Sequence, residues 1–84
     1  MVKVQVYTWS NCPYCVRAKD LLKKKGVAFE EIDLDGKDSE LMALRERTGL
    51  RTVPQIFIGD TMIGGFNELA ALDSKGELNK MLGI

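Results

Sequence analysis

The 84-residue sequence contains no histidine and only two cysteines, and this scarcity limits the chemistry open to the chain. A structural zinc site needs four ligands, so Cys12 and Cys15 would have to recruit carboxylates or a second subunit to hold a metal. Small secreted domains usually carry several disulfides, whereas these two cysteines are too close in sequence to close a useful loop. We therefore expect no metal, a cytoplasmic location and a chemical role for the cysteine pair.

An excess of charge and a long apolar run are also missing. The 12 basic and 12 acidic residues give a formal net charge of zero, so there is no electrostatic footprint for nucleic acid or an anionic membrane. No run of 18 apolar residues is present to span a bilayer, and Met1 leads directly into an apolar alternation without a signal-peptide core. We expect neither nucleic acid nor a membrane as a partner.

The residues that are present suit one small globular domain over residues 1–84, with 45% hydrophobic content and no repeats or linkers. Valine alternates with polar residues over Val2–Tyr7, which predicts a first strand. Apolar residues at helical spacing then predict a helix over Pro13–Lys25, with Pro13 suited to its first turn and Gly26 to its end.

The middle of the chain predicts a second strand and a second helix. Val27–Leu34 is typical of a strand, but Phe29 and Ile32 fall on opposite faces, so we expect a bulge or burial on both sides. A helix with a narrow apolar stripe is expected to begin near Asp38 or Ser39 and to stop at Gly49.

The last third of the chain predicts a hairpin followed by helical segments. Two short apolar runs, Gln55–Ile58 and Thr61–Ile63, are separated only by Gly59-Asp60, which favours a two-residue turn between antiparallel strands. Residues Glu68–Leu72 are helical in pattern, and Ser74-Lys75-Gly76-Glu77 has the spacing of a capping box that opens a last turn or two.

The expected order of elements is β-α-β-α-β-β-α. A strand, helix and strand in close succession imply a right-handed crossover between parallel strands, and the hairpin adds an antiparallel part. The fold class is therefore α/β, with a four-stranded mixed sheet flanked by helices.

The pair Cys12 and Cys15 stands at the expected start of the first helix. Residues three apart lie on one helical face, so a reversible disulfide is geometrically easy. Cys12 would be the N-cap, where the free N–H groups of Tyr14 and Cys15 favour an anion and should hold the thiol pKa below its usual value of about 8.5. A lower pKa raises the thiolate fraction but weakens the nucleophile, so its main benefit is that Cys12 leaves readily from a mixed disulfide.

Four stretches together show a resemblance to a known family: Tyr7-Thr8 followed by Cys12-Pro13-Tyr14-Cys15, then Arg51-Thr52-Val53-Pro54-Gln55-Ile56-Phe57-Ile58, Ile63-Gly64-Gly65, and Leu69 to Leu72-Asp73. From Val4 to Leu82 the sequence resembles the dithiol branch of the glutaredoxin family. The resemblance implies a thioredoxin-like fold and a glutathione-dependent oxidoreductase. It also implies that Cys12 is the nucleophile and Cys15 the resolving thiol.

The resemblance further implies a glutathione site. A cis peptide before Pro54 would face the disulfide, and the backbone of Val53 would bind the cysteine of glutathione. The N–H groups of Phe66 and Asn67, after Gly64-Gly65, would bind the γ-glutamyl carboxylate, although a core role for Phe66 and an N-cap role for Asn67 fit equally well. The expected glutathione-binding residues are Tyr14, Arg51, Thr52, Val53, Pro54, Gly65, Phe66 and Asn67.

One position departs from the family pattern. Relatives usually carry lysine three residues before the nucleophile, where it pairs with the glycine carboxylate of glutathione, and here that position is Trp9. Arg51 is the candidate to replace the missing charge, with a solvated loop charge as the alternative. Tyr14 is expected to shield one side of the groove.

Three functional hypotheses follow. The first is a monomeric enzyme that reduces disulfide-containing or glutathionylated proteins, with electrons from NADPH through glutathione reductase and glutathione. The second is a redoxin fed by thioredoxin reductase, whose Trp-Ser-Gly-Phe-Arg-Pro signature is absent here. The third is an iron–sulfur carrier that shares a cluster between two subunits, and Pro13 and Cys15 argue against it because such relatives commonly have other residues there.

Overall fold

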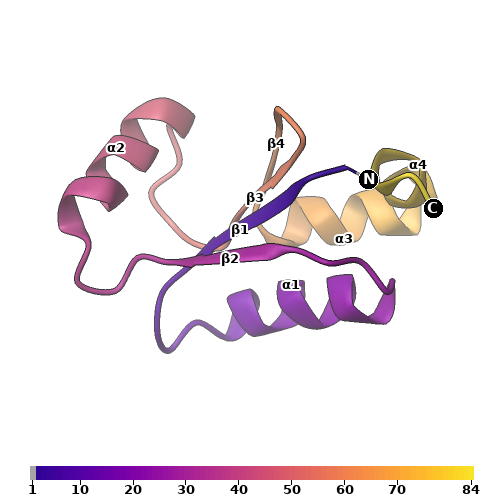
Figure 1. The fold of residues 1–84 in the computed structure, drawn as a ribbon, viewed down its shortest axis with the longest axis horizontal. Helices are drawn as coiled ribbons and strands as arrows, with labels where there is room; N and C mark the ends of the chain where they lie inside the picture. The colour runs from indigo at the N-terminus through magenta and orange to yellow at the C-terminus, as the bar shows by residue number, and fades with distance from the viewer. Residues whose placement is uncertain (1) are drawn as a thin grey trace.

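The computed structural model describes residues 2–84, and its sheet has the predicted mixed topology (Figure 1). The four strands lie in the order β2-β1-β3-β4. β1 pairs in parallel with β2 and antiparallel with β3, and β3 pairs antiparallel with β4. The elements are β1 (Val4–Thr8), α1 (Pro13–Lys24), β2 (Glu30–Asp33), α2 (Asp38–Thr48), β3 (Gln55–Ile58), β4 (Thr61–Gly64), α3 (Phe66–Ser74) and α4 (Glu77–Leu82).

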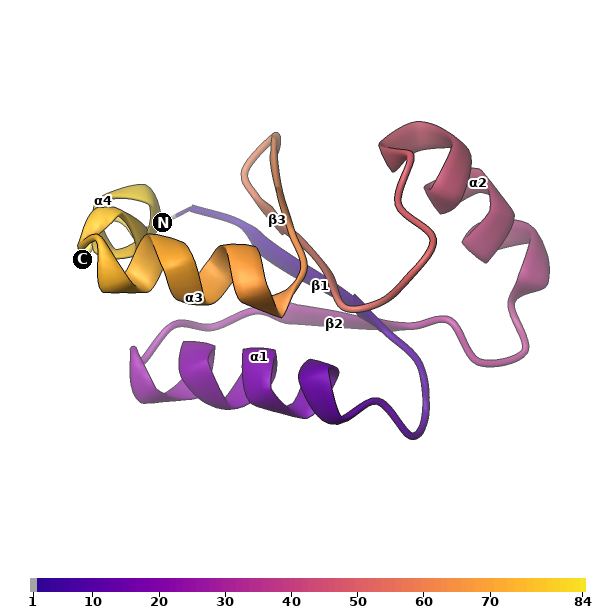
Figure 2. The same cartoon turned by 180° about the vertical axis from the view of Figure 1, so that it is seen from behind.

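The helices cover both faces of the sheet, as Figure 1 and Figure 2 show from opposite sides. α1, α3 and α4 pack on one face, in a core built from Val4, Val6, Ala18, Leu22, Ile56, Ile58, Leu69, Leu78 and Leu82. α2 covers the other face with the smaller cluster of Cys15, Leu34, Leu44 and Val53, which we call the second cluster. Cys15 of α1 thus packs in the second cluster, whereas Ala18 and Leu22 of the same helix pack in the larger core.

The second strand is shorter than predicted, since it begins at Glu30 and not at Val27. Phe29 packs against the main core while Ile32 packs against the second cluster. The expected burial on both sides is thus confirmed for these two partly buried residues, of which Phe29 lies just before β2. The first strand begins at Val4, and Val2, which precedes it, is exposed.

The predicted capping box at Ser74 is wrong. α3 begins at Phe66 and extends through Ser74, so that residue ends one helix and does not open the next. α4 starts after Gly76, whose φ of +74° turns the chain in the left-handed region without any side-chain cap. Leu69 is fully buried and Asp73 pairs with Lys25, the C-cap of α1, at 2.5 Å, and both contacts favour the longer α3. The chain consequently ends in two separate helices.

α2 has the narrow apolar stripe expected for it, with Leu44 as its buried residue and Gly49 as its left-handed C-cap. Within residues 2–84 no helix is both long and apolar enough to cross a membrane.

Candidate active site

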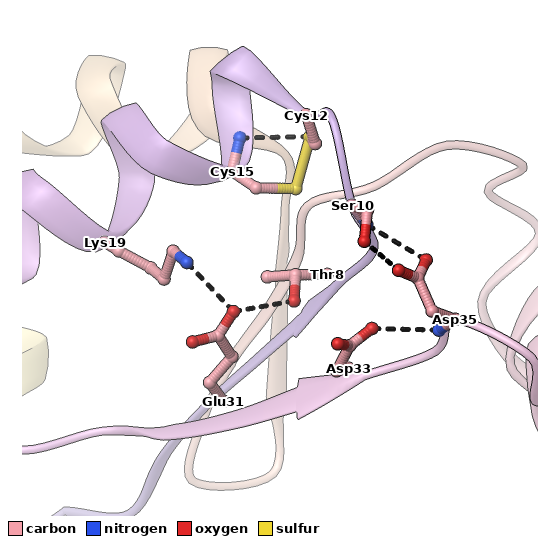
Figure 3. Close-up of polar contacts among 8 residues, drawn as sticks. All are labelled: Thr8, Ser10, Cys12, Cys15, Lys19, Glu31, Asp33 and Asp35. Carbon is pink, nitrogen blue, oxygen red and sulfur yellow. Dashed lines mark hydrogen bonds and ion pairs between the residues drawn. A yellow bond between two sulfur atoms is a disulfide. The ribbon is translucent and has the colours of Figure 1, made fainter.

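The two cysteines form a disulfide at the N-terminus of α1 (Figure 3). Cys12 is the N-cap in an extended conformation, and its Sγ accepts a hydrogen bond from the backbone N–H of Cys15 at 3.1 Å. Cys15 is only 2% exposed and packs in the second cluster, whereas Cys12 is half-buried. The two sulfurs therefore differ in access and in hydrogen bonding, as the cap position predicts.

The loop that leads into Cys12 is tied to the loop that follows β2. The backbone N–H of Ser10 donates to Asp35 Oδ1 at 2.9 Å, and the Ser10 hydroxyl bonds the other carboxylate oxygen (Figure 3). These two hydrogen bonds hold the pKa of Asp35 below its usual value. Asn11 then turns the chain with a φ of +56°, a conformation that asparagine tolerates better than most residues. This arrangement sets the direction from which the chain enters α1.

A second polar link joins α1 to β2 one turn after Cys15. Lys19 Nζ lies 2.9 Å from Glu31 Oε2, which also accepts a hydrogen bond from the hydroxyl of the buried Thr8 at 2.9 Å (Figure 3). The hydrogen bond from Lys19, followed by the one from Thr8, lowers the pKa of Glu31. An ion pair this exposed contributes at most about 1 kcal/mol to stability.

The segment before β3 reaches the disulfide from a distant part of the chain. The Val53–Pro54 peptide bond is cis, as expected, and both residues are buried. The carbonyl oxygen of Val53 lies 3.6 Å from Cys12 Sγ. Val53 is thus the backbone group that faces the more accessible of the two sulfurs.

A cleft of about 370 Å³ lies between this segment and the start of α3. Tyr14 and Phe66 stand at its edge with ring centroids 6.2 Å apart, and Tyr14 is 51% exposed with the guanidinium of Arg17 above its ring. Seven of the eight predicted binding residues line the cleft: Tyr14, Thr52, Val53, Pro54, Gly65, Phe66 and Asn67.

Arg51 is the predicted binding residue that does not line this cleft. It borders a different hollow, together with Met42, Arg45, Glu46 and Gly49 at the end of α2. Trp9, where relatives usually carry lysine, is half-buried and packs against the second cluster.

Glu68 lines the cleft but was not among the predicted residues. Its Oε1 accepts a hydrogen bond from the backbone N–H of Gly65 at 2.7 Å, in the manner of the carboxylate in a capping box. Gly64 has a φ of +112°, a conformation that favours glycine, and a Cβ there would lie 3.0 Å from the same oxygen. The Gly65-x-x-Glu68 spacing in the sequence was the signal for this contact.

A family model and individual related sequences both match this chain to glutaredoxins. Residues 4–63 match the family model for glutaredoxin. Glutaredoxin 3 of Escherichia coli K12 is 48% identical over 82 residues, which are 98% of this chain and 99% of that protein. A probable glutaredoxin of Synechocystis is 52% identical over 81 residues, which are 95% of this chain and 74% of that protein.

Among solved structures, the crystal structure of the buckwheat glutaredoxin–glutathione complex matches with a TM-score of 0.93 and 35% identity, covering 98% of this chain and 77% of that one. Among residues 2–84, no three or more histidine, cysteine, aspartate or glutamate side chains are placed to share a metal ion. The disulfide at a helix N-terminus, the facing Val53–Pro54 segment and these matches together show that the chain belongs to the glutaredoxin family, whose members are thiol–disulfide oxidoreductases.

Proposed function

We propose that this chain reduces glutathione mixed disulfides and protein disulfides, with Cys12 as the nucleophile and Cys15 as the resolving thiol. The observation that carries this proposal is the unequal placement of the two sulfurs. Cys12 Sγ is half-buried and accepts a backbone N–H at the positive end of α1, while Cys15 is enclosed by the second cluster. A group that attacks external substrates needs the first environment, and a group that attacks only its neighbour tolerates the second.

The proposed reaction consists of two thiol–disulfide exchanges. The thiolate of Cys12 attacks one sulfur of the substrate disulfide, the substrate S–S bond breaks, and the departing thiolate takes a proton from solvent. The thiolate of Cys15 then attacks Cys12 Sγ, releases the second substrate thiol and forms the Cys12–Cys15 disulfide seen here. Two glutathione molecules restore both thiols and leave as glutathione disulfide.

A shorter route applies to glutathionylated substrates. The Cys12 thiolate attacks the glutathione sulfur of the substrate, the substrate S–S bond breaks, and the substrate leaves as its free thiol. A second glutathione then attacks the glutathione sulfur of the Cys12 mixed disulfide and forms glutathione disulfide. Cys12 then departs as a thiolate, which the N–H of Cys15 stabilises. Cys15 has no chemical step in this route.

We place glutathione in the cleft beside the disulfide. The backbone of Val53 is positioned to pair with the cysteine of glutathione, because its carbonyl lies 3.6 Å from Cys12 Sγ. The N–H groups of Phe66 and Asn67, at the start of α3, offer an anion site for the γ-glutamyl carboxylate. Tyr14 forms one wall of the cleft. The matching buckwheat glutaredoxin was solved as a complex with glutathione, which supports this placement.

We further propose that glutathione reductase supplies electrons indirectly, by regenerating glutathione from glutathione disulfide at the expense of NADPH. We also propose that the chain acts as a monomer in the cytosol, where the glutathione and thioredoxin systems keep thiols reduced and can return the Cys12–Cys15 pair to its dithiol form. Two alternative functions are tested by the experiment described next. They are a redoxin that is reduced by thioredoxin reductase and a carrier of an iron–sulfur cluster.

A coupled assay that follows NADPH oxidation separates these functions. With a glutathionylated peptide as substrate, we expect turnover with glutathione and glutathione reductase, and none with thioredoxin reductase alone. Turnover that depends on thioredoxin reductase would replace the proposal with the second function. Visible absorbance of the anaerobically purified protein, together with no turnover in either arm, would favour the cluster carrier.

The substitution Trp9→Lys should tighten glutathione binding. An exposed ion pair with the glycine carboxylate contributes about 0.2 to 1 kcal/mol, which corresponds to roughly 1.4- to 5-fold in affinity. The measurement is the apparent glutathione affinity at low and high salt, because screening should remove the gain. Trp9→Met is the matched control, since it also removes the ring from the second cluster but adds no charge. Equal affinities for the two variants at low salt would contradict this account of the carboxylate site.

A further inference from the structure

The side chain of Gln55 is a buried amide beside the active site to which the mechanism assigns no role. Gln55 follows Pro54 directly, begins β3 and pairs with Tyr7 of β1. Its exposed fraction is 0%, and it is one of only two buried polar residues in the described part of the chain. Buried amides are costly unless their hydrogen bonds are satisfied, so the contacts of this side chain indicate why it is there.

The amide nitrogen of Gln55 holds two carbonyl groups of the preceding loop. Nε2 donates to the carbonyl oxygen of Leu50 at 3.1 Å and to that of Thr52 at 3.1 Å. Residues 50–54 belong neither to α2 nor to β3, so no helix or sheet ladder fixes these carbonyls. With both amide hydrogens used, one side chain fastens the loop at two points.

The amide oxygen of Gln55 contrasts with the amide nitrogen. Oε1 is buried and accepts no hydrogen bond from residues 2–84. The two donated hydrogen bonds are therefore the feature that sets glutamine apart from an apolar residue at this position.

The loop held by Gln55 leads into the residues that face the disulfide. Thr52, Val53 and Pro54 line the cleft, and the Val53 carbonyl lies 3.6 Å from Cys12 Sγ. We propose that Gln55 is a positioning residue for glutathione: its amide holds Leu50 and Thr52, and thereby keeps the Val53 backbone in the arrangement that binds the ligand. This inference rests on the proposed glutathione site and adds to it the group that preorganises one wall.

Loss of the two hydrogen bonds should reduce binding without changing the thiol chemistry. If the loop spends only a fraction of its time in the binding arrangement, the apparent affinity for the ligand falls by that fraction. Activation of Cys12 depends instead on the N–H of Cys15 and the start of α1, which Gln55 does not contact through any hydrogen bond. The expected signature is a higher KM with an unchanged reactivity of Cys12.

The test is Gln55→Met, which keeps the length and approximate volume of the side chain but removes both donors. Gln5→Met is the matched control, because Gln5 lies on the adjacent β1 and its amide makes only an exposed hydrogen bond to Glu30. In Gln55→Met the KM for a glutathionylated peptide should rise about fivefold or more, which is the equivalent of about one net hydrogen bond. The rate of Cys12 alkylation by iodoacetamide, and the KM of Gln5→Met, should stay at the wild-type values.

An unchanged KM in folded Gln55→Met, or a proportional loss of alkylation rate, would overturn the proposal. Hydrogen exchange supplies a measurement that does not depend on turnover. In the wild-type protein the side-chain amide hydrogens of Gln55 should be protected, and in Gln55→Met the backbone amides of residues 50–53 should exchange faster. Rapid exchange of the wild-type Gln55 side-chain amide would refute the proposed positioning role of Gln55, even if the variant fails to fold. If the Gln55 side-chain amide is protected in a wild-type protein that does not reduce the glutathionylated peptide, the proposed function is refuted, but the two hydrogen bonds from Gln55 to the loop are confirmed.

Discussion

Cys12→Ser is expected to lose all turnover, with glutathionylated peptide and protein disulfide alike reduced no faster than in the absence of protein. A serine hydroxyl is not appreciably ionised near neutral pH, and an oxygen in place of Sγ cannot form the mixed disulfide. The variant should keep its fold, because the serine side chain is itself a favourable N-cap and can accept the N–H of Cys15. The expected loss is therefore chemical.

Steady-state rates and mass spectrometry of the variant with each substrate measure this effect. No glutathione adduct should form on Cys12→Ser, and Cys15→Ser, which makes the same atomic change three residues away, is the control. An adduct or measurable turnover in Cys12→Ser would show that Cys15 can act as the external nucleophile. Its 2% exposure argues against that outcome.

The second large effect is a division of activities in Cys15→Ser. Reduction of the glutathionylated peptide should persist, because a second glutathione resolves the intermediate and Cys15 takes no part. Reduction of a protein disulfide that requires an intramolecular resolving thiol should be lost. The backbone N–H that donates to Cys12 Sγ at 3.1 Å does not depend on the side chain at position 15, so the variant should keep this hydrogen bond to the Cys12 thiolate.

Parallel assays of Cys15→Ser with the two substrates measure this division, and mass spectrometry should show a stable adduct on Cys12 with the protein substrate. The alkylation rate of Cys12 as a function of pH checks that the nucleophile is unaltered. If Cys15→Ser were inactive on the glutathionylated peptide while that pH profile stayed normal, the assignment of Cys15 as a purely resolving thiol would be wrong.

The packing around Cys15 explains why the two effects should differ. Cys15 shares the second cluster with Leu34, Leu44 and Val53, and these neighbours exclude an external substrate from its sulfur. The sulfur of Cys12 is within its reach, since the two cysteines form a disulfide in this structure. We expect this burial to restrict Cys15 to the intramolecular step and to protect it from unwanted reaction.

Local sequence patterns were sufficient for most of the secondary structure. Alternating valines indicate β1, helical spacing after Pro13 indicates α1, and Gly59-Asp60 between two apolar runs indicates the β3–β4 hairpin. The errors occurred where tertiary contacts outweigh local signals. Ser74 has the spacing of an N-cap, yet α3 continues through it because Leu69 is buried in the core and Asp73 pairs with Lys25.

The sequence alone also determined the chemistry of the cysteine pair, because the contact between Cys12 and Cys15 lies within a single helical turn. Only the tertiary structure could bring Val53, 41 residues away, to within 3.6 Å of that sulfur, since the approach depends on β3 lying beside β1. The same packing puts Glu68 in the cleft and Arg51 in another hollow. A cap and a helical period are properties of neighbouring residues, whereas a cleft is formed by segments whose distance depends on strand order and register.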